Sequence, residues 1–104
     1  MHQKSQKDEK STVIKRLNAL KGQLTDVGVT QLGLFGSTVR GENTSKSDID
    51  ILLDFKSGQE TFPNFMNACR ILEKGFGSIK LDVVTLKGLS PYIGKTILSE
   101  VEYV

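Results

Sequence analysis

The sequence predicts an α+β fold, because two kinds of apolar pattern alternate along the chain. Three segments repeat apolar side chains at three- and four-residue spacing, as amphipathic helices do; they are 13–24, 65–76 and 93–101. Three shorter segments carry the alternating or continuous apolar pattern of strands; they are 29–36, 48–55 and 79–85. The order is therefore helix, strand, strand, helix, strand, helix.

The composition is that of one globular domain. The 104 residues, 38% of them hydrophobic, are enough to bury a core without disulfides or a structural metal. A formal charge of +2 is too small to indicate a nucleic-acid partner, so we expect no direct nucleic-acid binding. Residues 1–10 are polar, and we expect a flexible tail there and a single domain at 11–104. The tail has no apolar core, which argues against a signal peptide or membrane anchor and favours the cytoplasm.

The first helix is expected to begin at Ser11 or Thr12, because either hydroxyl can cap it. Gly28 follows the helix as a stop signal. The apolar residues after Gly28 form the first strand, which ends where the chain must turn at Gly36.

The clearest strand of the chain is 48–55. Before it, residues 38–40 leave room for about one helical turn, and residues 42–47 carry no apolar side chain and indicate a solvated loop. Along 48–55 apolar and mostly polar positions alternate. One face carries Ile49, Ile51, Leu53 and Phe55, and the other carries Asp48, Asp50, Leu52 and Asp54.

The second half of the chain adds a helix, a strand and a helix. Pro63 suits the first position of a helix that ends near Gly75 or Gly77. The segment 79–85 is a third strand, with Asp82 on the face opposite to its main apolar side chains. Ser90-Pro91 is a cap and first-position pair for the last helix.

Three aspartates are candidates for a metal site. Asp48 and Asp50 share one face of a strand, with Cα atoms about 6.6 Å apart. Their charges repel unless a cation lies between them, and Mg²⁺ prefers oxygen ligands of this kind. If the second and third strands pair, Asp82 faces the same space, and three carboxylates can support two-metal phosphoryl or nucleotidyl transfer. Taken singly, each acid is more simply a solvated strand residue; the combination favours a site.

A Gly-Ser pair precedes the acids and is a candidate phosphate-binding turn. Gly36 has no Cβ, so backbone there can approach a phosphate closely. Ser37 opens the next turn and can donate from its amide and hydroxyl, although it can also serve merely as a cap. Arg40 can pair with a phosphate or with the clustered acids, and an ion pair with Glu42 or Asp54 is an equally simple alternative.

The spacing of these residues resembles the signature of the nucleotidyltransferase superfamily that includes DNA polymerase β. The motif is Gly36-Ser37, ten intervening residues, and Asp48-Ile49-Asp50. The longer stretch 34–55 is similar to the minimal nucleotidyltransferases, small bacterial and archaeal proteins that are often the antitoxin of a toxin–antitoxin pair. Residues 81–84 resemble that family's third-acid strand and 91–101 its last helix, so the resemblance runs from Val13 onward.

The resemblance implies a nucleotidyltransferase fold, with a small mixed sheet of about three to four strands and helices packed on one face. It implies that Gly36 and Ser37 hold the triphosphate of ATP and that Asp48 and Asp50 bind Mg²⁺, as one or two ions. Asp82 would complete the metal site and help to activate the incoming hydroxyl. Proteins of this type transfer AMP from ATP to a tyrosine of a partner HEPN-domain toxin. The core motif is complete, although Val39 stands where a smaller residue such as alanine is common.

Two other functions stay open on the residues alone. An antitoxin can neutralise its toxin by protein binding, with a vestigial nucleotide site. A nucleotidyltransferase can also modify a small molecule, although that acceptor would need a binding site that a single small domain lacks and a dimer could build. The acceptor, the preferred nucleotide, the number of AMP groups and the homo- or hetero-oligomeric state are not set by these motifs.

Overall fold

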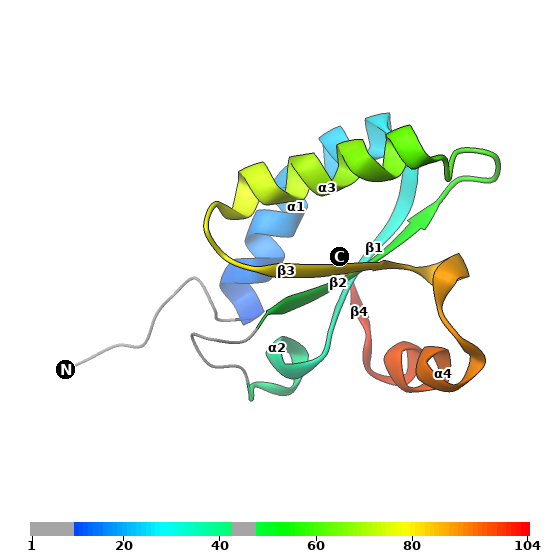
Figure 1. Ribbon diagram of the computed structural model, residues 1–104. Helices are drawn as coiled ribbons and strands as arrows, with labels where there is room; N and C mark the ends of the chain where they lie inside the picture. Colours follow the sequence, from blue (N-terminus) through cyan, green and yellow to red (C-terminus); the bar gives the residue numbers. More distant parts are fainter. Residues whose placement is uncertain (1–9, 43–47) are drawn as a thin grey trace.

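A four-stranded sheet with helices on both faces makes up the protein, as seen in a computed structural model that describes residues 10–42 and 48–104 (Figure 1). In chain order the elements are α1 (Lys10–Asp26), β1 (Val29–Phe35), α2 (Ser37–Arg40), β2 (Ile49–Phe55), α3 (Phe62–Phe76), β3 (Leu81–Thr85), the 3₁₀ turn η2 (Leu86–Gly88), α4 (Pro91–Glu100) and β4 (Glu102–Tyr103). The predicted α+β class is confirmed.

The sheet is mixed, with the strand order β3-β2-β1-β4. Strand β1 runs antiparallel to β2 and to β4, whereas β2 and β3 are parallel. The parallel pair uses α3 as its crossover, which is the usual way to connect parallel neighbours. The edge strand β4 has only two residues, too few for the alternation by which the other strands are recognised.

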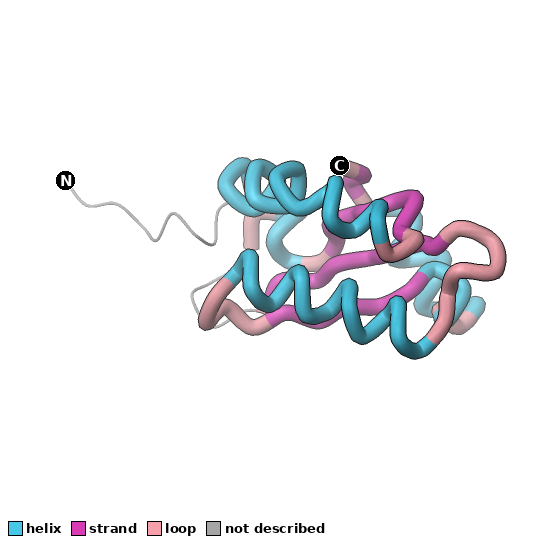
Figure 2. The backbone as a smooth tube through the Cα atoms, turned by 90° about the horizontal axis from the view of Figure 1, so that it is seen from above, coloured by secondary structure: helices cyan, strands magenta, loops and turns pink. Residues whose placement is uncertain are grey.

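The main core lies between the sheet and the two long helices. Helices α1 and α3 lie side by side over one face of the strands (Figures 1 and 2). The apolar face predicted for 48–55 contributes all of its residues to this core, each at most 2% exposed. The buried helical residues facing them are Val13, Leu17, Leu20, Leu24, Ala68, Leu72 and Phe76.

Helix α4 packs on the opposite face, which corrects the expectation that all helices share one face. A second, smaller core there joins Phe35, Leu52 and Ile97, with Val84 and Val101 packed against it. Figure 1 shows α2 and α4 together on that side of the strands. The acid-bearing face of β2 is therefore partly covered by α4.

The start of the chain differs from the sequence-based expectation. Helix α1 already includes Lys10, so Ser11 and Thr12 lie inside the helix, and neither is its cap. Lys10 donates to Glu102 of β4 over 2.6 Å, which ties the helix to the sheet edge. The rest of the predicted flexible tail and most of the predicted loop at 42–47 lie outside the described residues. Within the described part, none of the helices has the length and apolar character that a membrane crossing requires.

Candidate active site

Two aspartates meet on the face of the sheet that α4 only partly covers. The buried neighbours of Asp50 on β2 point into the main core, so Asp50 itself points to the other face. The parallel register pairs Asp50 with Asp82 of β3, and the antiparallel register pairs it with Phe35, the last residue of β1. The sheet thus sets three positions side by side: the end of β1, Asp50 and Asp82.

Asp48 lies next to this pair but outside strand β2. It lies one residue before β2 and is exposed, although its charge still acts on Asp50. Among the described residues, no three His, Cys, Asp or Glu side chains are grouped closely enough to hold a metal ion. The structure therefore joins two of the three predicted acids directly and leaves the third beside them.

The carboxyl of Asp50 has a strongly perturbed pKa. Burial is the largest cause, followed by the charges of Asp82 and Asp48 and a hydrogen bond to Asp82, and together they raise the pKa of Asp50 to about 6. The charge of Arg40 acts in the opposite direction. Two ionised carboxyls side by side repel each other, so the pair concentrates negative charge that a cation would relieve.

This perturbation predicts a pH-dependent stability when divalent ions are removed. Below about pH 4 the Asp50 carboxyl is protonated in both folded and unfolded chains. Above about pH 6 it is ionised in both, and the folded state carries the full repulsion. We therefore expect the free energy of unfolding of the wild type to fall, relative to Asp50→Asn, as the pH rises from 4 to 6. Urea unfolding of both proteins in a chelating buffer measures the difference; a constant difference across this range contradicts the assignment.

Gly36 forms the turn between β1 and α2 in a conformation that other residues rarely adopt. Its φ is 77°, in the left-handed region, and a Cβ built on it would overlap the carboxylate of Asp50. The carbonyl of Gly36 accepts hydrogen bonds from the amides of Val39 and Arg40, which begin the single turn of α2. The glycine is thus required by the close approach of the turn to Asp50.

Arg40 is held by two glutamates at the end of α2. Its Nε donates to Glu42 over 2.9 Å and its Nη1 donates to Glu100 over 2.8 Å. These hydrogen bonds and charges raise the pKa of Arg40 further above its usual range. The predicted alternative pairing with Glu42 is observed, and the pairing with Glu100 was not anticipated.

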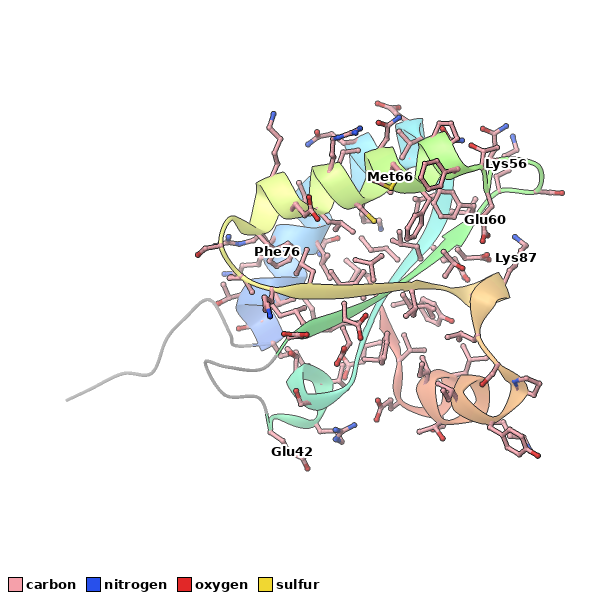
Figure 3. The ribbon with its side chains drawn as sticks, in the orientation of Figure 1. Glu42, Lys56, Glu60, Met66, Phe76 and Lys87 are labelled. Carbon is pink, nitrogen blue, oxygen red and sulfur yellow. The ribbon has the colours of Figure 1, made fainter. Side chains whose placement is uncertain are left out.

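Asp54, on the same face of β2, belongs to a different group of charges. Lys87 Nζ lies 3.4 Å from Asp54 Oδ1 and 3.9 Å from Glu60 Oε1. Figure 3 shows Glu60 and Lys87 near one another at the opposite end of the sheet from Glu42. This placement agrees with leaving Asp54 out of the candidate site.

A hollow of about 610 Å³ opens beside Asp82. Most of its walls are apolar, and they come from the sheet, α3 and α4. The residues that shape it include Phe35, Phe65, Val84, Leu89, Ile93 and Ile97. A group that enters this hollow lies beside the exposed carboxyl of Asp82.

Comparison with known proteins shows to which family the chain belongs. A family model described as a nucleotidyltransferase domain matches residues 11–104. The chain belongs to the nucleotidyltransferase family. This nucleotidyltransferase is 38% identical over 91 residues to the protein adenylyltransferase MntA of Thermococcus cleftensis, a match that covers 85% of this chain and 88% of the relative.

Solved structures agree with this assignment. A protein named as a candidate minimal nucleotidyltransferase superposes with a TM-score of 0.78 at 29% identity, covering 90% of this chain and 94% of the other. A chain from a crystal structure of a toxin–antitoxin complex with AMP-PNP shares the fold, with a TM-score of 0.65 at 21% identity, covering 86% of this chain and 69% of that one. The predicted membership in the minimal nucleotidyltransferases is confirmed, and the protein is a nucleotidyltransferase enzyme.

The donor set fits a hard divalent cation, the kind of metal that nucleotidyltransferases typically use. Mg²⁺ is bound in proteins mainly through carboxylate oxygens and water, and seldom requires a complete cage of side chains. Asp50 and Asp82 offer adjacent carboxyls whose repulsion a cation would remove, and Asp48 lies close enough for its charge to act on Asp50. These three residues are the ones that would hold the ion.

Proposed function

We propose that this nucleotidyltransferase transfers AMP from ATP to a hydroxyl group of a partner protein, using Mg²⁺ held by Asp48, Asp50 and Asp82. The Asp50–Asp82 pair beside the Gly36 turn is the observation that carries the proposal. The backbone of Gly36 comes close to the carboxylate of Asp50, and the neighbouring carboxyl of Asp82 is exposed and lines an open hollow. The triphosphate would bind at the Gly36 turn, and the acceptor would enter through the hollow beside Asp82.

Each residue then has a role in the transfer. The Gly36-Ser37 turn and Arg40 bind the triphosphate, and bound Mg²⁺ would neutralise charge on the phosphate oxygens. Asp82, exposed beside the hollow, accepts the proton of the acceptor hydroxyl. The acceptor oxygen forms a bond to the α-phosphorus, the bond from that phosphorus to the bridging oxygen breaks, and pyrophosphate leaves.

The acceptor that we propose is a tyrosine of a HEPN-domain toxin, with this protein acting in the cytoplasm as the antitoxin. Two observations support a protein acceptor. The relative from Thermococcus cleftensis is named a protein adenylyltransferase. The hollow beside Asp82 is largely apolar, as suits a side chain delivered by another protein.

A labelling experiment tests the proposal. The purified protein is incubated with ATP labelled at the α-phosphate, Mg²⁺ and the protein encoded by the adjacent gene. We expect label on that partner, on tyrosine by mass spectrometry, and none when Mg²⁺ is chelated. If the partner stays unlabelled while the two proteins still bind each other and the toxin is neutralised, the antitoxin acts by binding alone. If neither protein is labelled but a small hydroxyl compound is, the acceptor assignment fails.

A further inference from the structure

Glu100, the last residue of α4, bridges two parts of the candidate phosphate-binding region. Its Oε2 accepts a hydrogen bond from the amide of Gly36 over 2.8 Å, and its Oε1 accepts one from Arg40 Nη1 over 2.8 Å. Its side chain is only 21% exposed. One carboxylate therefore joins the end of β1, the end of α2 and the end of α4.

The position of Glu100 is unfavourable by local rules. The carboxyl end of a helix carries partial negative charge, which disfavours an acid there, and the last turn of α4 contains no basic residue to offset it. Among the described residues, the contacts that compensate for this come from outside the helix: the amide of Gly36 and the guanidinium of Arg40. A local rule broken beside a functional site indicates a role in that site.

The contacts of Glu100 also restrict Arg40. Two of the three guanidinium nitrogens are held, one by Glu42 and one by Glu100. A guanidinium fixed at two nitrogens keeps its direction. Arg40 is thereby kept at the turn that leads to Asp50, although its side chain is 47% exposed.

We propose that Glu100 is a positioning residue for nucleotide binding, which fixes Arg40 and the Gly36 amide so that the turn is preformed for the triphosphate. Glu100 itself does not contact the nucleotide; it acts through Arg40 and the backbone. Preforming a binding site removes part of the entropy that ordering it would otherwise cost on binding. This inference rests on the proposed function, because it assumes that the turn binds a triphosphate.

Calorimetry tests the positioning role of Glu100 without any acceptor, because it measures directly the binding of a non-hydrolysable ATP analogue with Mg²⁺. Glutamine has one acceptor oxygen where glutamate has two, so Glu100→Gln can satisfy only one of the two donors. We expect it to weaken binding about tenfold, as loss of a hydrogen bond to a charged group does. Glu100→Asp keeps the carboxylate on a shorter side chain, so its affinity for the analogue should lie between that of the wild type and that of Glu100→Gln. The matched control is Glu102→Gln, which removes a carboxylate paired with Lys10 two residues further on and should bind within twofold of the wild type.

A double-mutant comparison separates positioning from a general structural effect. If Glu100 acts through Arg40, Arg40→Ala weakens binding by a similar factor, and the double variant binds no more weakly than Arg40→Ala alone. Additive losses, unchanged binding of Glu100→Gln, or tighter binding of Glu100→Gln overturn the proposal; the last would mean that Glu100 competes with the phosphate. Thermal unfolding of each variant checks that it is folded, and Arg40→Ala, at an exposed site, supplies the test should Glu100→Gln not fold. If the wild type binds no nucleotide, the proposed function fails as well, whereas equal binding by wild type and Glu100→Gln rejects this inference alone.

Discussion

Replacing Asp50 by asparagine is expected to reduce AMP transfer by about a thousandfold or more, while the folded state is retained. Asp50 is the central member of the site, next to Asp82 in the sheet register and directly under the Gly36 turn. Its charged form is the one that would bind a divalent cation, and losing such a charge from a buried site typically costs a factor of 10² to 10³ or more. Asparagine has nearly the same shape and no charge, so the repulsion within the acid pair disappears.

The same substitution should leave stability unchanged or raise it at neutral pH. The raised pKa of Asp50 shows that its ionised form is disfavoured in the folded chain. Loss of activity together with a midpoint of thermal unfolding at or above that of the wild type would therefore separate a catalytic role from a structural one. The labelling assay and a thermal scan of the same preparation measure both quantities.

Asp54→Asn is the matched control for this prediction. Asp54 lies on the same strand and face, but its carboxylate contacts Lys87 instead of the candidate site. We expect its transfer rate to stay within about threefold of the wild type, since exposed ion pairs of this kind contribute little. A transfer rate of Asp50→Asn within tenfold of the wild type would remove Asp50 from the proposed machinery.

The fold class and the direction of Asp50 could be predicted because apolar residues and acids alternate along β2, with Leu52 as the exception. Ile49, Ile51 and Leu53 all enter the main core, and a shift by one residue would move every one of them out of it to the acid-bearing face. That constraint sends Asp50 to the other face without any knowledge of the site. The same reasoning placed Asp82 on the face opposite to Leu81 and Val83, and the parallel register then brings it beside Asp50.

The sequence could not show which face of the sheet α4 covers. An amphipathic helix has one apolar side, but its periodicity does not say against which surface that side packs. The signal that was present is Leu52, an apolar residue on the acid-bearing face of β2, which is buried against Ile97 of α4. A single apolar residue among acids is weak evidence for a second core, and only the three-dimensional packing makes it clear.

Glu100 escaped prediction for a related reason. It is separated by 64 residues from Gly36 and by 60 from Arg40, and no local pattern links them. Its position at the end of a helix, where an acid is unfavourable, was the available signal. Thr38 is similar: its buried hydroxyl finds no hydrogen-bond partner among the described residues, and no motif indicated that it would be buried.

Replacing Gly36 by alanine is expected to reduce AMP transfer by about a hundredfold. The added Cβ would occupy the place of the Asp50 carboxylate, so Asp50 has to turn away from its position beside Asp82. Displacing a reacting group by about 1 Å can cost on the order of a hundredfold in rate. The loss should appear mainly in the rate of transfer, measured at saturating ATP.

Gly41→Ala is the control for a side chain placed at a positive φ in the same turn. Gly36 and Gly41 have positive φ values of 77° and 74°, but the ψ of Gly36 is −155°, in a region that essentially only glycine adopts, whereas Gly41 is left-handed helical with a ψ of 19°. Alanine therefore costs about 1 kcal/mol at Gly41 and more than that at Gly36. A Cβ at Gly41, however, meets no heavy atom within 4 Å, whereas one at Gly36 meets Asp50. Both variants should therefore lose stability, Gly36→Ala more than Gly41→Ala, and only Gly36→Ala should lose transfer by two orders of magnitude. Equal activity losses in the two variants would show that the turn needs glycine for its backbone alone, and the close approach of Gly36 to Asp50 would then have no part in the reaction.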